Sequence, residues 1–202
     1  MLPTRVIGSF TLIPQQAADR DFHGPWNKLL NYLFSPDSPY TVIPREHYSI
    51  AATQEQSGMV REHQPELWFM KFEVQFENLP ILIVLVSAPT VIESPLAREL
   101  ADAEIRKQMT SSIELCPLST LRAISVFGCY MCTYTCDVAA PKPEIYPTLI
   151  EQLAAGAGKA RDLAPRDRWC SDIQAVEGQQ VLGRLVESTK AECMKEAENR
   201  VV

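Results

Sequence analysis

Two strand patterns follow each other directly in the middle of the chain, and together they constrain the fold more than any other feature. The even-numbered residues of 68–76 are all apolar, whereas the odd-numbered ones include Lys71 and Glu73. This alternation is the period of a half-buried strand. After a turn at residues 78–80, the run 81–86 (ILIVLV) is continuously apolar and rich in β-branched residues, which is typical of a central strand covered on both faces. The pair predicts a hairpin that ends in a central strand.

Apolar residues at helical spacing predict three helices. The first covers residues 25–34, with Pro25 in its first turn. The second begins at a Ser94 cap followed by Pro95 and runs to about residue 113, and the third covers residues 174–199. The buried side of the second helix is expected to carry Leu96, Leu100 and Ala103.

The remaining strands complete an α/β pattern. Residues 40–44 (YTVIP) predict a short strand, and the polar stretch 45–64 predicts a loop or a frayed helix. Residues 121–136 predict two further strands, bent at Gly128. The order helix, strands, helix, strands, helix predicts an α/β fold with a central mixed β-sheet flanked by helices.

The length of 202 residues fits one domain. We expect a single domain over residues 1–202, in which residues 1–21 form an N-terminal extension. Residues 137–168 contain four prolines and a glycine-rich stretch, which predicts a long loop region.

The formal net charge of −6 makes non-specific nucleic-acid binding improbable, because proteins that grip phosphate backbones usually carry a basic excess. We therefore expect the partner, which the sequence does not identify, to be a protein. The longest apolar run is far shorter than the roughly 20 residues of a membrane helix, so no membrane association is expected. The N-terminus matches a signal peptide poorly. The sequence thus favours a soluble, intracellular protein of the cytoplasm or nucleus.

Four segments carry a resemblance to a known family: GPWNKLLNYLFSPDSPYTVIP, FEVQFENLPILIVLVSAP, LADAEIRKQM and the closing DRWCSDIQ with a following EG. In this order they resemble a large family of fungal proteins, mostly from mushroom-forming basidiomycetes, over residues 22–195. The family has a restriction-endonuclease-like core of the PD-(D/E)XK type. The resemblance implies that fold, whose core order of helix, hairpin, helix and strand pair agrees with the predicted elements.

The resemblance also implies where a nuclease centre would lie. In that family the central strand usually carries an acid, one residue and then a lysine, which hold Mg²⁺ and orient a water. The matching positions here are Leu85 and Ser87, so this acid-x-Lys motif is degenerate. Glu66 and Glu73 are the remaining candidates for catalytic acids.

The leading hypothesis is therefore a catalytically inactive nuclease-like fold, a pseudoenzyme, that acts as a binding or scaffolding module without a cofactor. The first alternative is a metal-dependent nuclease whose carboxylates have moved to Glu66, Glu73 or Glu93; Mg²⁺ would be its cofactor. The second is a small-molecule enzyme or accessory protein that uses a different cleft. The sequence leaves open whether the protein is an enzyme, and it favours a protein without catalytic activity.

Cysteines and histidines give no complete metal motif. Cys129, Cys132 and Cys136 form C-x2-C-x3-C, but positions 129 and 132 of a strand point to opposite faces, which favours packing over zinc binding. His23 and His47 are far apart in the sequence, as is the third histidine. We therefore predict no metal site and no tightly bound divalent ion.

Overall fold

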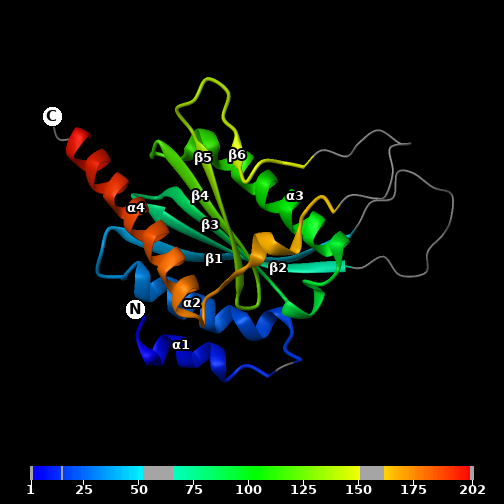
Figure 1. Ribbon diagram of the computed structural model, residues 1–202. Coiled ribbons are helices and arrows are strands. Elements are labelled where there is room, and N and C mark those ends of the chain that lie inside the picture. Colours follow the sequence, from blue (N-terminus) through cyan, green and yellow to red (C-terminus); the bar gives the residue numbers. More distant parts are fainter. Residues whose placement is uncertain (1, 15, 52–65, 151–161, 201–202) are drawn as a thin grey trace, which may run out of the picture.

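The computed structural model describes residues 2–14, 16–51, 66–150 and 162–200, in which seven strands form one sheet (Figure 1). In chain order the strands are β1 (Tyr40–Ala51), β2 (Glu66–Phe76), β3 (Leu79–Ser87), β4 (Thr120–Phe127), β5 (Tyr130–Asp137), β6 (Ile145–Tyr146) and β7 (Ser171–Asp172). The sheet order is β1-β2-β3-β4-β5-β6, and β7 also pairs with β5. Only β3 and β4 pair in parallel; the other pairs are antiparallel. The predicted mixed sheet is confirmed.

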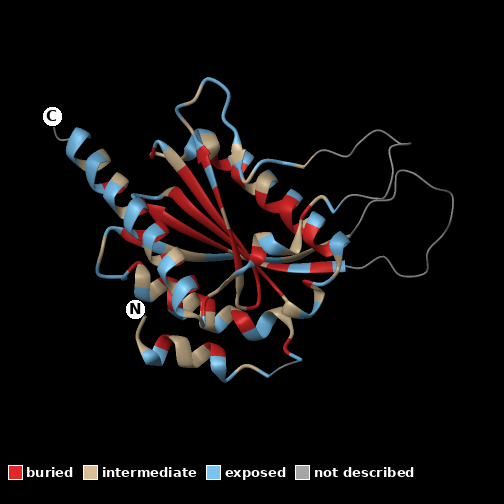
Figure 2. Cartoon of the chain, in the orientation of Figure 1, coloured by how far each residue is buried: buried red, intermediate tan, exposed pale blue. Residues whose placement is uncertain are grey.

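Helices cover both faces of this sheet. The helices α1 (Thr4–Thr11), α2 (His23–Leu33) and α4 (Val176–Arg200) contribute to one apolar core with the sheet, and α3 (Pro95–Ser112) contributes to a second. Short 3₁₀ turns lie between them: η1 (Asp19–Phe22), η2 (Pro89–Val91), η3 (Ile113–Leu115) and η4 (Arg166–Trp169). Figure 2 shows the buried sheet between the two helical layers, so the predicted α/β class with flanking helices is confirmed.

The predicted β2–β3 hairpin is present, with a tighter turn than expected. Glu77 and Asn78 both have positive φ angles, 50° and 66°, as the two central residues of a type I′ hairpin turn require. Strand β3 is central. Val84 and Val86 belong to the core under α1, α2 and α4, whereas Leu85 belongs to the core under α3.

Helix α3 begins as predicted but buries another face. The Ser94 hydroxyl oxygen accepts a hydrogen bond from the Ala97 amide, and Pro95 is the first helical residue. The buried apolar residues are Ala97, Ala101, Ile105 and Met109. The expectation that Leu96, Leu100 and Ala103 form the buried side is wrong: Leu96 and Ala103 are exposed and Leu100 is half-buried. The physical reason is that α3 also buries charged groups, which an apolar pattern does not reveal.

Strand β1 is longer than the sequence suggested. It has 12 residues and pairs with β2 along most of that length, interrupted by a bulge between Pro44 and His47. The prediction of a loop or frayed helix from residue 45 is therefore wrong for residues 45–51, where backbone pairing to β2 outweighs polar composition. Residues 52–64 of that prediction lie outside the described residues. The two strands predicted around Gly128, which has a φ of 64°, are β4 and β5.

Residues before 22 contribute to the core. Val6 and Phe10 of α1 are buried, and the Phe10 ring contacts the Trp26 ring edge-on with 5.6 Å between centroids.

In the predicted loop region 137–168, the described part contains β6 and the start of η4. Among the described helices, none has the length and apolar character that a membrane crossing requires.

Candidate functional site

The two degenerate motif positions lie inside the protein. Leu85 is 0% exposed and packs in the core between the sheet and α3. Ser87 is 1% exposed, and its hydroxyl makes no hydrogen bond within the described part of the chain. Leu85 lies opposite Lys71 of β2 in the β2–β3 register. The sheet face that carries Leu85 is thus occupied by an apolar core at this point.

Glu73 lies on the same strand face as Lys71 and is engaged by its neighbours. Its Oε1 accepts hydrogen bonds from Arg45 Nη2 at 2.8 Å and from Gln75 Nε2 at 2.6 Å, and Lys71 Nζ lies 3.9 Å from Oε2. Burial, the largest single influence, raises the pKa of Glu73, but the hydrogen bonds and the charges of Arg45 and Lys71 outweigh it. The pKa therefore lies below its usual value, as for a carboxylate in a structural ion pair.

The other two predicted acids lie elsewhere. Glu66 is exposed at the start of β2 and accepts a hydrogen bond from the Ser49 hydroxyl. Because Glu66 and Glu73 are seven positions apart on one strand, about 23 Å of extended chain separates them. Glu93 is exposed and pairs with Arg166, with 3.3 Å between Oε1 and Nε. The structure does not bring these three carboxylates together.

A layer of paired polar groups fills the space between β1, β2 and α3. Lys71 Nζ donates to Gln108 Oε1 at 2.7 Å, and Gln108 Nε2 donates to Glu104 Oε1 at 2.7 Å. The Tyr48 hydroxyl also donates to Glu104 Oε1, at 2.8 Å. Burial raises the pKa of Tyr48, and its bond to Glu104 adds to this. Each group of this layer has a protein partner, which is typical of a structural contact between helix and sheet.

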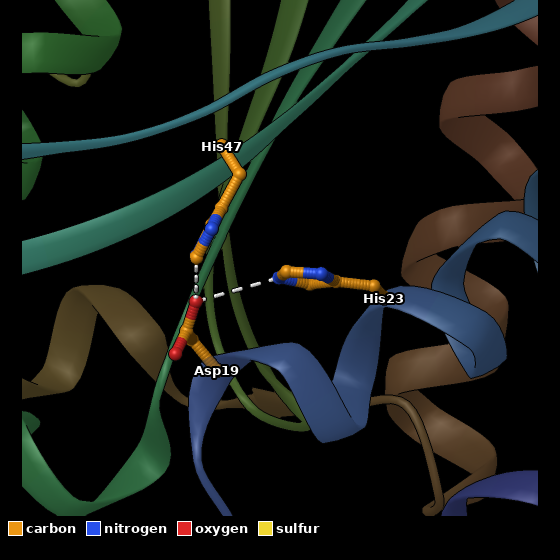
Figure 3. A group of neighbouring side chains, drawn as sticks. All are labelled: Asp19, His23 and His47. Carbon is orange, nitrogen blue, oxygen red and sulfur yellow. Dashed lines mark hydrogen bonds and ion pairs between the residues drawn. The ribbon is translucent and has the colours of Figure 1, made fainter.

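A different cluster is formed by Asp19, His23 and His47 (Figure 3). Asp19 begins η1 and His23 begins α2, so the two side chains are four positions apart on adjoining helical turns and face the same side. His47 follows the bulge in β1. Its Nε2 lies 2.5 Å from Asp19 Oδ2, and His23 Nε2 lies 3.4 Å from the same oxygen. Two imidazole rings thus converge on one carboxylate oxygen of Asp19.

The surroundings of this cluster hold the rings in place. The Trp68 ring lies 4.9 Å from the His47 ring, tilted by 33°, and the two imidazole rings are 5.1 Å apart. Burial lowers the pKa of His23, and the neighbouring His47 lowers it further, although Asp19 and Asp21 oppose this. One ligand atom from each of the three side chains lies within 4.8 Å of the other two; in the described part of the chain, no other group of three or more His, Cys, Asp or Glu does so.

Sequence reasoning missed this cluster. The spacing Asp19-x3-His23 is compatible with a shared helical face, but the boundary between η1 and α2 is not marked by any apolar period. His47 lies in the stretch that was predicted as loop or frayed helix. The contact between His47 and Asp19 depends on the β1 bulge, and bulges are not readable from one sequence.

Cys129 and Cys132 lie on opposite sides of the sheet, as the strand spacing predicts. All six cysteines are free. Cys132 and Cys136 are buried in the core under α3, whereas Cys129 packs against the core on the opposite face. Burial raises the pKa of Cys129 and of Cys132 to about 12. Cys132 and Cys136 thus pack as core side chains.

Neither a protein-family model, nor a curated protein, nor a solved structure matches this chain. Functional proposals for the chain therefore depend on its own geometry, and first on the two places described above, which are the closed β2–β3 face under α3 and the Asp19–His23–His47 cluster beside β1.

Proposed function

We propose that this chain has a restriction-endonuclease-like fold that is degenerate at the acid-x-Lys positions and that it acts as a binding or scaffolding module rather than as a nuclease. The order of elements supports the fold assignment. Helix α2 precedes the β2–β3 hairpin, α3 crosses over to β4, which pairs in parallel with β3, and β5 follows. This is the core order that the resemblance implies.

The observation that carries the inactive assignment is the complete burial of Leu85. A leucine that is 0% exposed within an apolar cluster leaves no room for a hydrated metal ion, since Mg²⁺ keeps several waters. On the same face of β2, Lys71 is hydrogen-bonded to Gln108 and Glu73 to Arg45. The groups that a nuclease would use are absent or already paired.

A nuclease with relocated carboxylates has less support. Such a centre requires two or more acids around one metal. Glu66 and Glu73 lie about 23 Å apart along β2, and Glu93 is exposed and paired with Arg166. A working centre would therefore need a rearrangement of the sheet itself.

A groove between α2 and α4 is the surface that we assign to a partner. Its volume is about 460 Å³, and Leu2, Leu33, Gln179, Gln180 and Gly183 contribute to its lining. Tyr32 and Val176 add half-exposed apolar surface, while Arg184 and Glu187 add charges of both signs. A mixed lining of this kind suits a polypeptide segment with both apolar and polar side chains, and it suits a polyanion poorly.

The catalytic half of the proposal is tested with purified full-length protein, labelled single- and double-stranded DNA and RNA, and Mg²⁺ or Mn²⁺. We expect no cleavage above that of a buffer control. Cleavage that co-purifies with the chain and is abolished by Glu73→Gln or Glu66→Gln would show that the nuclease alternative is correct. Glu77→Gln, at an exposed ion pair with Arg200, serves as the matched control.

The binding half of the proposal is tested by affinity capture of partner proteins. The wild-type chain and a Tyr32→Asp, Val176→Asp double variant serve as the baits. We expect a partner whose capture is lost in this variant and kept in Leu115→Asp, which changes an exposed leucine that does not line the groove. Equal capture by all three proteins would show that the groove is not the binding surface.

A further inference from the structure

The distances within the Asp19–His23–His47 cluster are close to those of a metal site. In a tetrahedral site with ligand bonds of about 2.0–2.1 Å, neighbouring ligand atoms lie about 3.3 Å apart. The 3.4 Å between His23 Nε2 and Asp19 Oδ2 agrees with this value. The 2.5 Å between His47 Nε2 and Asp19 Oδ2 is shorter, as for a hydrogen bond that an ion would replace. Small rotations of the His47 side chain would move its Nε2 away from Asp19 Oδ2 and make room for an ion.

In the cluster, the buried His23 Nε2 has an ion-pair contact with Asp19 but no hydrogen bond within the described part of the chain. This nitrogen points at the cluster (Figure 3). A buried nitrogen without a hydrogen bond costs free energy, which a bound ion would recover.

Neighbouring groups preorganise the three side chains. The β1 bulge precedes His47 and turns its side chain, and Trp68 packs against the His47 ring. Trp68 is 41% exposed, which is unusual for a tryptophan, and contact with His47 accounts for its position. Asp21 Oδ2 accepts a hydrogen bond from the Ala18 amide at 2.9 Å, so η1 is fixed where it presents Asp19. Rigid support of this kind is a requirement of metal sites.

The donor set indicates the class of ion. Two imidazole nitrogens and one carboxylate oxygen suit a borderline divalent transition metal, whereas Mg²⁺ and Ca²⁺ prefer oxygen ligands only. Imidazoles bind metals in their neutral form, and the burial that lowers the pKa of His23 favours that form. Among such ions, Zn²⁺ tolerates irregular ligand angles because it has no geometric preference from its d electrons.

We propose that Asp19, His23 and His47 form a three-ligand site for one Zn²⁺ ion, with the fourth position left to water on the exposed side of His47. The ion ties the junction of η1 and α2 to strand β1. The site lies on the sheet face opposite α3, away from Leu85. It contradicts the sequence-based expectation that the chain binds no divalent ion tightly, because that expectation treated His23 and His47 as distant from each other.

The test is a calorimetric titration of the metal-free full-length chain with Zn²⁺, with thermal unfolding in parallel. We expect one ion per chain and a raised Tm in excess Zn²⁺. Asp19→Asn, His23→Gln and His47→Gln should each weaken binding more than about 10-fold, since loss of a mere supporting group already costs that much. The controls are Glu77→Gln and Cys170→Ser, which removes an exposed thiol; both should bind Zn²⁺ as the wild type does.

A second measurement covers the case in which a variant fails to fold. In the unmodified chain, the imidazole ¹⁵N resonances of His23 and His47 should shift together on addition of one equivalent of Zn²⁺. Absence of stoichiometric binding, binding unchanged in all three cluster variants, or binding lost in Cys170→Ser would overturn the proposal. Imidazole resonances that do not respond to Zn²⁺ would also overturn it.

Discussion

His47 Nε2 lies 2.5 Å from Asp19 Oδ2, although 28 positions separate the two residues in the chain. The contact joins the 3₁₀ turn η1, which lies directly before α2, to the bulged strand β1 at the edge of the sheet. Polar contacts between elements this far apart in sequence fix the elements relative to each other. It is also the contact around which the proposed zinc site is arranged.

The first prediction concerns pH. Because the pKa of His23 in the folded protein lies below its ordinary value of 6.5, the unfolded chain binds more protons between those two pKa values. The stabilisation is fully present above pH 6.5 and is lost as the pH falls through the folded-state pKa. Urea unfolding without metal, from about pH 7.5 to about pH 5, should show the free energy of unfolding decreasing toward acid.

The matched control for this pH effect is His23→Gln, which keeps a polar side chain but does not titrate. Its free energy of unfolding should depend less on pH over the same range. Asp19, Asp21 and His47 are the neighbours that influence the pKa of His23, and all three are kept in both proteins. If the two proteins show the same slope, His23 does not carry the effect.

The second prediction concerns thiol reactivity. Burial raises the pKa of Cys132 to about 12 and that of Cys193 to about 11, so almost no thiolate is present near neutral pH. Cys170 is the one exposed cysteine. Iodoacetamide followed by peptide mass spectrometry should label Cys170 first, with Cys132 and Cys193 labelled only after unfolding. Rapid native labelling of Cys132 would show that the core under α3 opens.

The third prediction concerns the motif positions. Introducing the acid-x-Lys pattern of the proposed nuclease-like fold with Leu85→Glu and Ser87→Lys places two charges at positions that are 0% and 1% exposed. Burying a charge without a prepared partner costs several kcal/mol, so we expect a loss of more than about 4 kcal/mol or failure to fold. Urea denaturation measures the loss.

A conservative variant separates charge from shape in that experiment. Leu85→Met keeps the volume and polarity of the side chain and should cost less than about 1.5 kcal/mol. If the double variant instead folds with nearly wild-type stability, a hydrated cleft is present beside β3. That result would contradict the closed face on which the inactive assignment depends.

Much of the fold could be predicted from one sequence because it depends on local periods. Alternation in β2 and the continuous run in β3 follow directly from burial on one face or on two. The Ser94 cap of α3 is a local side-chain to backbone contact. The buried face of α3 was predicted wrongly because Arg98, Asp102 and Glu104 are buried as well. Their burial depends on partners from distant segments, such as Arg168 beside Asp102.

The candidate metal cluster could not be predicted for a similar reason. Its ligands come from η1, α2 and β1, and only the pair Asp19 and His23 is close in sequence. The polar stretch around His47 has the composition of a loop, and its pairing with β2 makes it a strand. The apolar periods therefore predict the elements that carry them. Sequence patterns fail where strand pairing or ion contacts decide the structure.

The most direct test of the closed nuclease face is a Mg²⁺ titration. The full-length chain, previously saturated with Zn²⁺, is titrated with Mg²⁺ in a calorimeter and compared with Glu73→Gln. We predict no stoichiometric Mg²⁺ site below about 100 μM, because the fully buried Leu85 stands where the proposed nuclease-like fold would carry its metal-binding acid. One Mg²⁺ bound per chain, and lost in Glu73→Gln, would contradict the account and favour a working metal centre on β2 and β3.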